Sequence, residues 1–204
     1  MAVETWIAFL AAASVMLLIP GPTILLVIGQ SLGGGRRAAL PLVAGVAAGD
    51  LVAMTLSLAG LGALLSASAT LFTAFKWVGA AYLVYLGLRL WRAPVEPGMA
   101  PPLTARAAWQ QAFIVTALNP KSVAFFVAFV PQFLDPARPF LPQAAVLVAS
   151  FVLLAALNAL LYALAAGRLS GAVRRPGVRR ALNRVGGGVL IGAGLATATL
   201  RRAG

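Results

Sequence analysis

Three charged side chains, Asp50, Lys76 and Lys121, stand inside long apolar stretches of a 204-residue sequence. Within a lipid bilayer a bare charge is costly, so such a group must be protonated, paired or hydrated, and it usually serves function. Asp50 would lie near the bilayer midplane, roughly 16 Å along its helix. We expect it to carry protons or to bind a cationic group, and the alternative is a structural ion pair with Lys76 or Lys121.

Each lysine also has two interpretations. Lys121 could neutralise Asp50, or it could hold a substrate carboxylate or gate proton release, and the sequence does not choose between these roles. Lys76 lies nearer the end of its apolar stretch, so its ammonium group could reach the membrane surface along the flexible side chain. Position alone slightly favours that surface role over proton coupling.

Prolines interrupt two of the apolar stretches, at Pro20-Gly21-Pro22 and at Asn119-Pro120-Lys121. Proline has no N–H to bond four residues back, so the carbonyls of Met16, Leu18 and Thr116 should lose their helical partners. An unpartnered carbonyl is costly in hydrocarbon, so broken backbone must be buried in protein or line a hydrated cavity. Matched breaks in two halves of a chain are typical of a transporter's binding site.

Each break should begin a second half-helix, because Asn119 followed by Pro120 is typical of an N-cap and a first helical residue. The free N–H groups of such a start favour an anion, and the freed carbonyls before it favour a cation. A site with both characters suits a zwitterion, although a proline taken singly could simply kink a helix. The residues predicted to bind substrate are Pro20, Gly21, Pro22, Thr23, Asp50, Asn119, Pro120 and Lys121. Those predicted to couple protons are Asp50, Lys76 and Lys121.

The composition indicates a membrane protein, since 61% of residues are hydrophobic and 10% are charged. Cysteine and histidine are absent, which removes disulfides, thiolate and imidazole metal sites and the usual acid–base catalyst. We therefore expect no cofactor, no metal site and no enzymatic activity. The net charge of +12 comes from arginines at the ends of apolar segments, a placement that argues against nucleic-acid binding.

Six apolar segments are long enough to cross a bilayer core, which takes about 20 residues. They are 5–30, 39–63, 69–91, 110–133, 141–166 and 183–200. Arginines gather in the first, third and fifth connections, which the positive-inside rule places in the cytoplasm, so both termini should be periplasmic. These arginines are Arg36, Arg37, Arg89, Arg92, Arg106, Arg168, Arg174, Arg175, Arg179, Arg180 and Arg184.

The two halves of the chain look like a repeat. Pro20 and Pro120 occupy matching positions, as do Pro41 and Pro142, although chance could produce such matches in apolar helices. Three spans per half would insert the second copy upside down. We predict an all-α, polytopic membrane protein with six transmembrane helices in an inverted 3+3 repeat and with helices 1 and 4 broken. It forms a single membrane domain, residues 1–204, with repeats 1–93 and 109–204 joined by a linker, 94–108.

Two further features concern packing. Gly45 and Gly49 form a GxxxG spacing, which could serve packing within the subunit or in a dimer. Asn158, in the fifth segment, is a weaker candidate for a contact with substrate or with another helix.

Several motifs together resemble the LysE/RhtB family of amino-acid exporters. They are Pro20-Gly21-Pro22, the stretch from Gly45 to Asp50, the stretch from Lys76 to Gly87, and Asn119-Pro120-Lys121 running into Phe125-Phe126 and Pro131-Gln132-Phe133. The resemblance implies a bacterial inner-membrane protein that exports amino acids or close derivatives, is driven by the proton-motive force and forms homodimers. It also raises the functional weight of Lys76, which begins one of the motifs.

The function predicted from the sequence is export of an amino acid from the cytoplasm by proton antiport. The partners are therefore the amino acid, protons and membrane lipid. A single midplane carboxylate favours a neutral amino acid, because a dibasic substrate would call for a second acid. The alternatives are export of another small solute or a lipid on the same scaffold, and a membrane scaffold without transport.

Overall fold

The computed structural model describes residues 1–34, 36–67, 69–92, 103–173 and 176–199, and the secondary structure of this part of the chain is helical. The helices are α1 (Val3–Leu18), α2 (Pro22–Gly34), α3 (Arg36–Ala67), α4 (Ala69–Trp91), α5 (Ala105–Ala117), α6 (Pro120–Ala128), the short 3-10 helix η1 (Val130–Phe133), α7 (Phe140–Val173) and α8 (Pro176–Thr199). An all-helical fold is thus confirmed for these residues.

Both predicted breaks are present. Helices α1 and α2 meet at an angle of 57°, and α5 meets the α6–η1 segment at 42°. Each second half-helix begins with a proline, Pro22 in α2 and Pro120 in α6, where the missing N–H has no helical partner to lose. The equivalent positions in the two breaks are therefore Pro22 and Pro120, which shifts the match by two residues from the predicted pair of Pro20 and Pro120.

By length and hydropathy, the described residues contain two membrane spans, or up to four if each bent pair counts as one span. Two are single helical segments, Ala38–Gly60 and Phe140–Ala166, and two are the bent pairs, Val3–Leu18 with Pro22–Ser31 and Ala105–Ala117 with Pro120–Phe133. The predicted third and sixth spans fall on α4 and α8, which are not among these four, so the six-span arrangement stays a prediction. Most of the predicted linker, residues 93–102, lies outside the described part of the chain.

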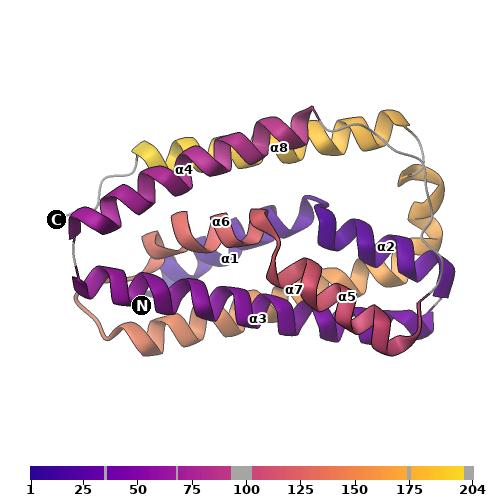
Figure 1. The fold of residues 1–204 in the computed structure, drawn as a ribbon, viewed down its shortest axis with the longest axis horizontal. Coiled ribbons are helices and arrows are strands. Elements are labelled where there is room, and N and C mark those ends of the chain that lie inside the picture. Colours follow the sequence, from indigo (N-terminus) through magenta and orange to yellow (C-terminus); the bar gives the residue numbers. More distant parts are fainter. Residues whose placement is uncertain (35, 68, 93–102, 174–175, 200–204) are drawn as a thin grey trace.

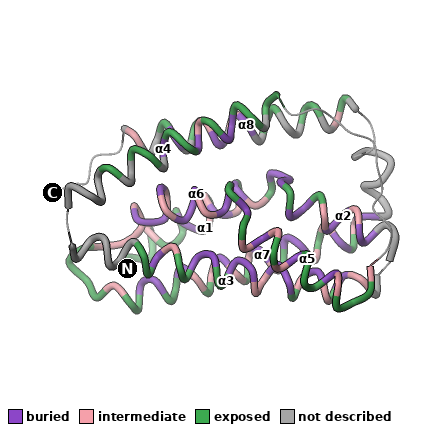
Figure 2. Tube along the Cα trace, viewed as in Figure 1, coloured by how far each residue is buried: buried purple, intermediate pink, exposed green. Residues whose placement is uncertain are grey.

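The helices form a bundle with a two-helix layer on one side (Figure 1). Helices α4 and α8 lie side by side in this layer, and α6 lies between them and the longer helices α3 and α7. Glycines allow the close approach: a Cβ added at Gly87 would lie 2.6 Å from the Gly187 carbonyl oxygen. Many of the residues of α4 and α8 whose burial is described are exposed, whereas α6 is mostly buried (Figure 2).

The predicted GxxxG spacing packs within the subunit. A Cβ added at Gly45 would lie 2.5 Å from the Trp109 carbonyl oxygen, and one at Gly49 would lie 2.8 Å from the Phe113 carbonyl oxygen. Contacts this short require glycine, so the spacing in α3 lets the backbone of α5 approach closely. This packing positions the second break, because α5 leads directly into it.

Two hydrophobic clusters flank the breaks and differ in composition. One is rich in aromatic side chains from α1, α6 and α7, with Phe9, Phe125, Phe126 and Phe151 buried in it. The other joins α2, α3, α5 and α7 through smaller side chains, namely Val27, Ala39, Leu42, Val46, Ala108, Ala112, Ala159 and Ala163. The breaks are thus held between a bulky aromatic layer and a layer of small residues.

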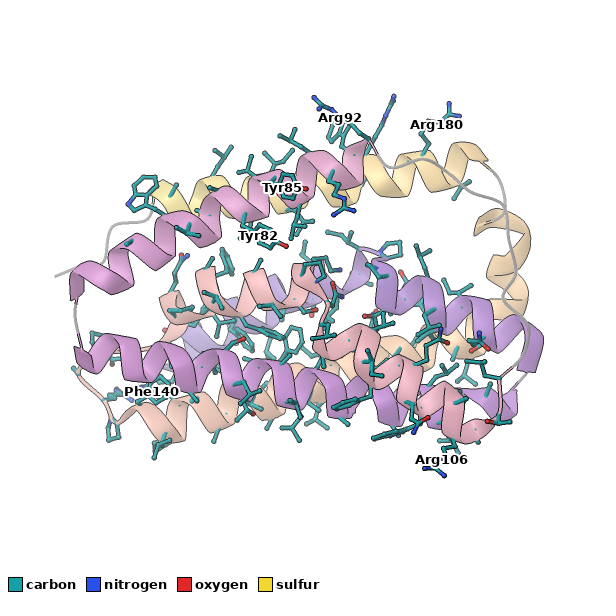
Figure 3. The ribbon with its side chains drawn as sticks, in the orientation of Figure 1. Tyr82, Tyr85, Arg92, Arg106, Phe140 and Arg180 are labelled. Atoms are coloured by element: carbon teal, nitrogen blue, oxygen red, sulfur yellow. The ribbon has the colours of Figure 1, made fainter. Side chains whose placement is uncertain are left out.

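Basic side chains mark one end of the bundle. Arg92, Arg106 and Arg180 lie toward the end opposite Phe140, the first residue of α7 (Figure 3). Helices α1 and α7 begin at the end where Phe140 lies (Figure 1). The two ends of the bundle therefore differ: these arginines lie toward one end and not toward the other.

Candidate functional site

The two breaks meet around a small cavity of about 20 Å³ in the middle of the bundle. It is lined by Met16, Leu17, Gly21, Thr23, Ile24, Val46, Asp50, Asn119, Lys121, Ser122, Ala155 and Asn158. A cavity of this size holds about one water molecule, which is far less than an amino acid occupies. The cavity as it stands is therefore too small for an amino acid, and a larger ligand requires the groups that line it to move.

Lys121 closes the end of α1 from the opposite half of the chain. Its Nζ donates hydrogen bonds to the carbonyl oxygens of Met16, at 3.1 Å, and Ile19, at 2.9 Å. The Met16 carbonyl is the one that Pro20 was predicted to leave without a partner. Lys121 is 8% exposed, so both carbonyls receive a charged donor in an environment shielded from water.

Two side chains of α7 satisfy the other carbonyls at this helix end. Asn158 Nδ2 donates to the Leu17 carbonyl at 3.0 Å, and the Tyr162 hydroxyl donates to the Leu18 carbonyl at 2.9 Å. The Leu18 carbonyl is the one that Pro22 leaves without a partner. Asn158 and Tyr162 are four residues apart, so they lie on the same face of α7 and reach neighbouring carbonyls.

At the second break, the backbone hydrogen-bonding groups find their partners in neighbouring residues of the sequence. Asn119 Oδ1 accepts a hydrogen bond from the Lys121 backbone N–H at 3.1 Å, which caps the start of α6 as predicted. The backbone N–H of Asn119 donates to the Thr116 carbonyl at 3.0 Å, and that of Leu118 donates to the Ile114 carbonyl at 3.0 Å. The bonds that close this break therefore span only two to four residues.

Thr23 ties the two breaks together. Its Oγ1 accepts hydrogen bonds from Asn119 Nδ2 at 3.2 Å and from the Thr116 hydroxyl at 3.3 Å. All three side chains are buried. The first turn of α2 is thus fixed to the junction of α5 and α6.

Asp50 projects from α3 to the same cavity and is 3% exposed. Its Oδ1 has no hydrogen-bond partner in the described part of the chain. Asp50 and Lys121 line the same cavity but do not form a direct ion pair. Among the residues that the structure describes, the one ion pair with an N–O distance of 4.0 Å or less joins Arg138 to Asp135. Lys121 is thus held by carbonyls rather than by direct pairing with Asp50, the structural alternative considered from the sequence.

The predicted site residues divide into two groups. Gly21, Thr23, Asp50, Asn119 and Lys121 line the cavity. The three prolines are not among its lining residues, and Pro22 and Pro120 are exposed, so prolines shape the breaks rather than face the cavity.

The structure does not test the prediction for Lys76, but it does place Asn158. Lys76 lies in α4, but its side chain lies outside the described part of the structure, so its role stays a prediction. Asn158, a candidate for a contact with substrate or with another helix, lines the cavity and donates to the Leu17 carbonyl of α1.

Sequence reasoning missed Tyr162 and the side chain of Thr116. The signal for Tyr162 was its position four residues after Asn158 in an otherwise apolar helix, which places two polar groups on one face. The signal for Thr116 was a hydroxyl three residues before the Asn119 N-cap.

The family model described as LysE type translocator matches residues 14–200. The chain belongs to this family. A LysE type translocator is a transporter rather than an enzyme.

Relatives of this LysE type translocator extend over most of its length. An uncharacterized membrane protein of Vibrio cholerae is 35% identical over 98% of this chain and 100% of its own. The homoserine/homoserine lactone efflux protein of Salmonella typhimurium is 33% identical over 97% of this chain and 98% of its own. The leucine efflux protein of Salmonella typhimurium is 34% identical over 64% of each chain. No solved structure matches.

Proposed function

We propose that this LysE type translocator exports an amino acid from the cytoplasm by proton antiport, with a neutral amino acid favoured. The observation that carries the proposal is the small cavity where the two breaks meet, which brings an ammonium group, a buried carboxylate and side-chain amides together. These groups match the two charged ends of a zwitterion. The homoserine and leucine efflux proteins supply the substrate class.

The charge of the cavity supports a neutral substrate. Within the described residues Asp50 is the one carboxylate that lines it. One carboxylate can pair with the α-ammonium group of an amino acid. A dibasic substrate would bring a second cation without a partner, which is costly in a buried site.

The mechanism follows from competition at Asp50. Substrate enters from the cytoplasm when the broken helices open inward, and its carboxylate meets the half-helix starts near Lys121. Its ammonium group competes with a proton for Asp50. A proton that arrives from outside neutralises Asp50, so the substrate loses its counter-charge and leaves to the periplasm.

The topology that suits this mechanism is six spans in an inverted 3+3 repeat across the bacterial inner membrane, with both termini periplasmic. The basic end of the bundle would face the cytoplasm. The two halves would rock around the fixed cavity, and the translocator would work as a homodimer. The absence of cysteine makes single-cysteine labelling from either side of the membrane a clean test of this topology.

Asp50→Asn tests the proposed function. Purified protein in liposomes loaded with leucine or homoserine is exposed to an acidic outer buffer, and efflux is measured. The wild type should show efflux that increases with the pH gradient. Asp50→Asn should lose at least about tenfold of this gradient-driven rate, because its amide cannot bind and release a proton.

The matched control is Asp135→Asn, the same chemical change at an exposed carboxylate that pairs with Arg138 at 3.2 Å. It should transport like the wild type. Gradient-driven transport by Asp50→Asn at the wild-type rate would exclude Asp50 as the obligatory proton carrier. No transport of either amino acid by the wild type would count against amino-acid export itself.

A further inference from the structure

We propose that the carbonyl oxygens of Met16 and Ile19 form the subsite for the substrate's amino group, and that Lys121 fills this subsite while the site is empty. The inference rests on the proposed function and adds to it the atoms that recognise the ammonium group. It also gives Lys121 a specific task, which is to keep the subsite satisfied between transport cycles.

The carbonyl pair already binds a primary ammonium group. Lys121 Nζ lies 3.1 Å from the Met16 oxygen and 2.9 Å from the Ile19 oxygen, which are ordinary distances for charged hydrogen bonds. The side-chain ammonium of lysine and the α-ammonium of an amino acid carry the same three N–H donors. A substrate amino group in this place would therefore make the same two bonds.

In the empty site neither the Lys121 ammonium group nor the Asp50 carboxylate is in direct contact with an opposite charge. Lys121 is held by two neutral carbonyls, and Asp50 Oδ1 in the same cavity has no hydrogen-bond partner. A zwitterion completes both interactions. Its ammonium group binds the two carbonyls and Asp50, and its carboxylate takes Lys121, which turns away from the end of α1.

The exchange conserves charge in the cavity. Before it, the cavity contains one lysine ammonium and the Asp50 carboxylate, which are not in direct contact. After it, the same two charges each pair with the opposite end of a zwitterion whose own net charge is zero. No net charge enters a buried site, and two close ion pairs replace a separated one, so the step avoids the penalty of an unpaired buried charge.

The exchange also makes room. The cavity of about 20 Å³, which Lys121 helps to line, is too small for an amino acid. A Cβ added at Gly21 would lie 3.4 Å from Lys121 Nζ and Cε, so the lysine chain lies directly over this glycine. Movement of Lys121 toward a substrate carboxylate would free the space beside Gly21 for the amino end of the substrate.

Chemical rescue of Lys121→Ala tests the subsite without requiring transport. This replacement removes the atoms of one n-propylammonium ion, which can be returned from solution. The thermal midpoint of purified Lys121→Ala is measured with n-propylammonium and with tetramethylammonium, which has the same charge and no N–H donor. n-Propylammonium should raise the midpoint by more than about 2 °C over tetramethylammonium, and it should not do so in the wild type.

Competition then links the subsite to the substrate. In Lys121→Ala, n-propylammonium at roughly ten times its own Kd should weaken the apparent binding of leucine or homoserine about tenfold, because both ammonium groups need the same carbonyls. The matched control is Tyr162→Phe, which removes a neutral donor from the neighbouring Leu18 carbonyl and should show no rescue by n-propylammonium.

The subsite is overturned if n-propylammonium stabilises Lys121→Ala no more than tetramethylammonium does, or if it stabilises the variant without weakening amino-acid binding. Either result leaves export by the wild type intact. If n-propylammonium rescues but the wild type exports neither amino acid, the proposed function falls while the ammonium site stands.

A second variant covers the case in which Lys121→Ala does not fold. Lys121→Cys would carry the chain's sole thiol, since the sequence has no cysteine. Its attachment to an ethylammonium thiosulfonate reagent should restore the thermal midpoint, and attachment to the trimethylammonium analogue should not. Equal recovery with the two reagents would also overturn the subsite.

Discussion

At the first break the four carbonyls from Met16 to Ile19 accept hydrogen bonds from side chains of α6 and α7. At the second break the backbone groups are satisfied by residues two to four positions away, and the distant contact to Thr23 joins side chains only. The first break is thus closed by tertiary contacts, and the second by local ones. A local closure persists as long as α6 stays helical. A tertiary closure opens when α1 moves relative to α6 and α7, which makes the first break the part of the site suited to movement.

Of the variants that test this contrast, Lys121→Met should have the largest effect on stability. It keeps the length of the side chain but removes its hydrogen-bond donors. The carbonyls of Met16 and Ile19 would be left unsatisfied in a buried place, and each such group costs about 1–3 kcal/mol. We expect the unfolding free energy to fall by about 3 kcal/mol. Titration with a denaturing detergent, followed by circular dichroism, measures this loss.

Lys76→Met makes the same chemical change at the lysine predicted to reach the membrane surface. Its cost should be less than about 0.5 kcal/mol. If Lys121→Met costs no more than this control, the bonds from Lys121 do not close the first break, and the contrast between the breaks is lost.

The second test is Asn119→Ala, which removes the side chain that caps α6 at the second break. Loss of an N-cap costs about 1 kcal/mol, and the lost bond to Thr23 adds to this, so we expect about 2 kcal/mol in the same assay. Thr116→Val serves as the control, because it removes a single buried bond to Thr23 while Asn119 still caps α6. Thr116→Val should cost less than Asn119→Ala, and an equal cost would mean that the local cap adds nothing.

The same contrast explains what the sequence could predict about the site. The cap at Asn119 and the loss of helical partners at the Met16 and Leu18 carbonyls follow from local rules about proline and amide side chains, and these predictions are confirmed. The Thr116 carbonyl, predicted to lose its partner as well, keeps a local one in the Asn119 N–H. The donors that satisfy the Met16 and Leu18 carbonyls were not predicted, because Lys121 and Tyr162 lie 105 and 144 residues away along the chain. Which distant side chain arrives there depends on helix packing, which no short pattern encodes.

The fold shows a similar division. Each predicted span overlaps a helix, and residues 69–91 match the bounds of α4. However, α7 continues to Val173 rather than 166, and α8 begins at Pro176 rather than 183. The start of the fourth span was placed at residue 110, but α5 begins at Ala105 because the Thr104 hydroxyl caps it by accepting from the Ala107 N–H at 3.3 Å. The apolar pattern does not detect this polar first turn. It also could not show that Gly45 and Gly49 pack against α5 rather than against a second subunit.

The smallest test is Tyr162→Phe, which removes one neutral donor from the Leu18 carbonyl. A single hydrogen bond of this kind is worth about 0.6–1 kcal/mol, and we expect a loss of that size. Tyr82→Phe, the same change at an exposed tyrosine of α4, should be neutral within the error of the measurement. A neutral Tyr162→Phe would mean that the Leu18 carbonyl finds another donor once the hydroxyl is gone.

Double variants show to which break Tyr162 is coupled, because the cost of Tyr162→Phe can be measured alone and together with a change at each break. Tyr162 and Lys121 close the same helix end, so once Lys121→Met has released α1, Tyr162→Phe should cost less than it does alone. Asn119 closes the other break by local bonds, so the costs of Asn119→Ala and Tyr162→Phe should add to within about 0.5 kcal/mol. Coupling of Tyr162 to Asn119 as strong as its coupling to Lys121 would show that the two breaks open as one unit, and the first break would then not be the separately moving part of the site.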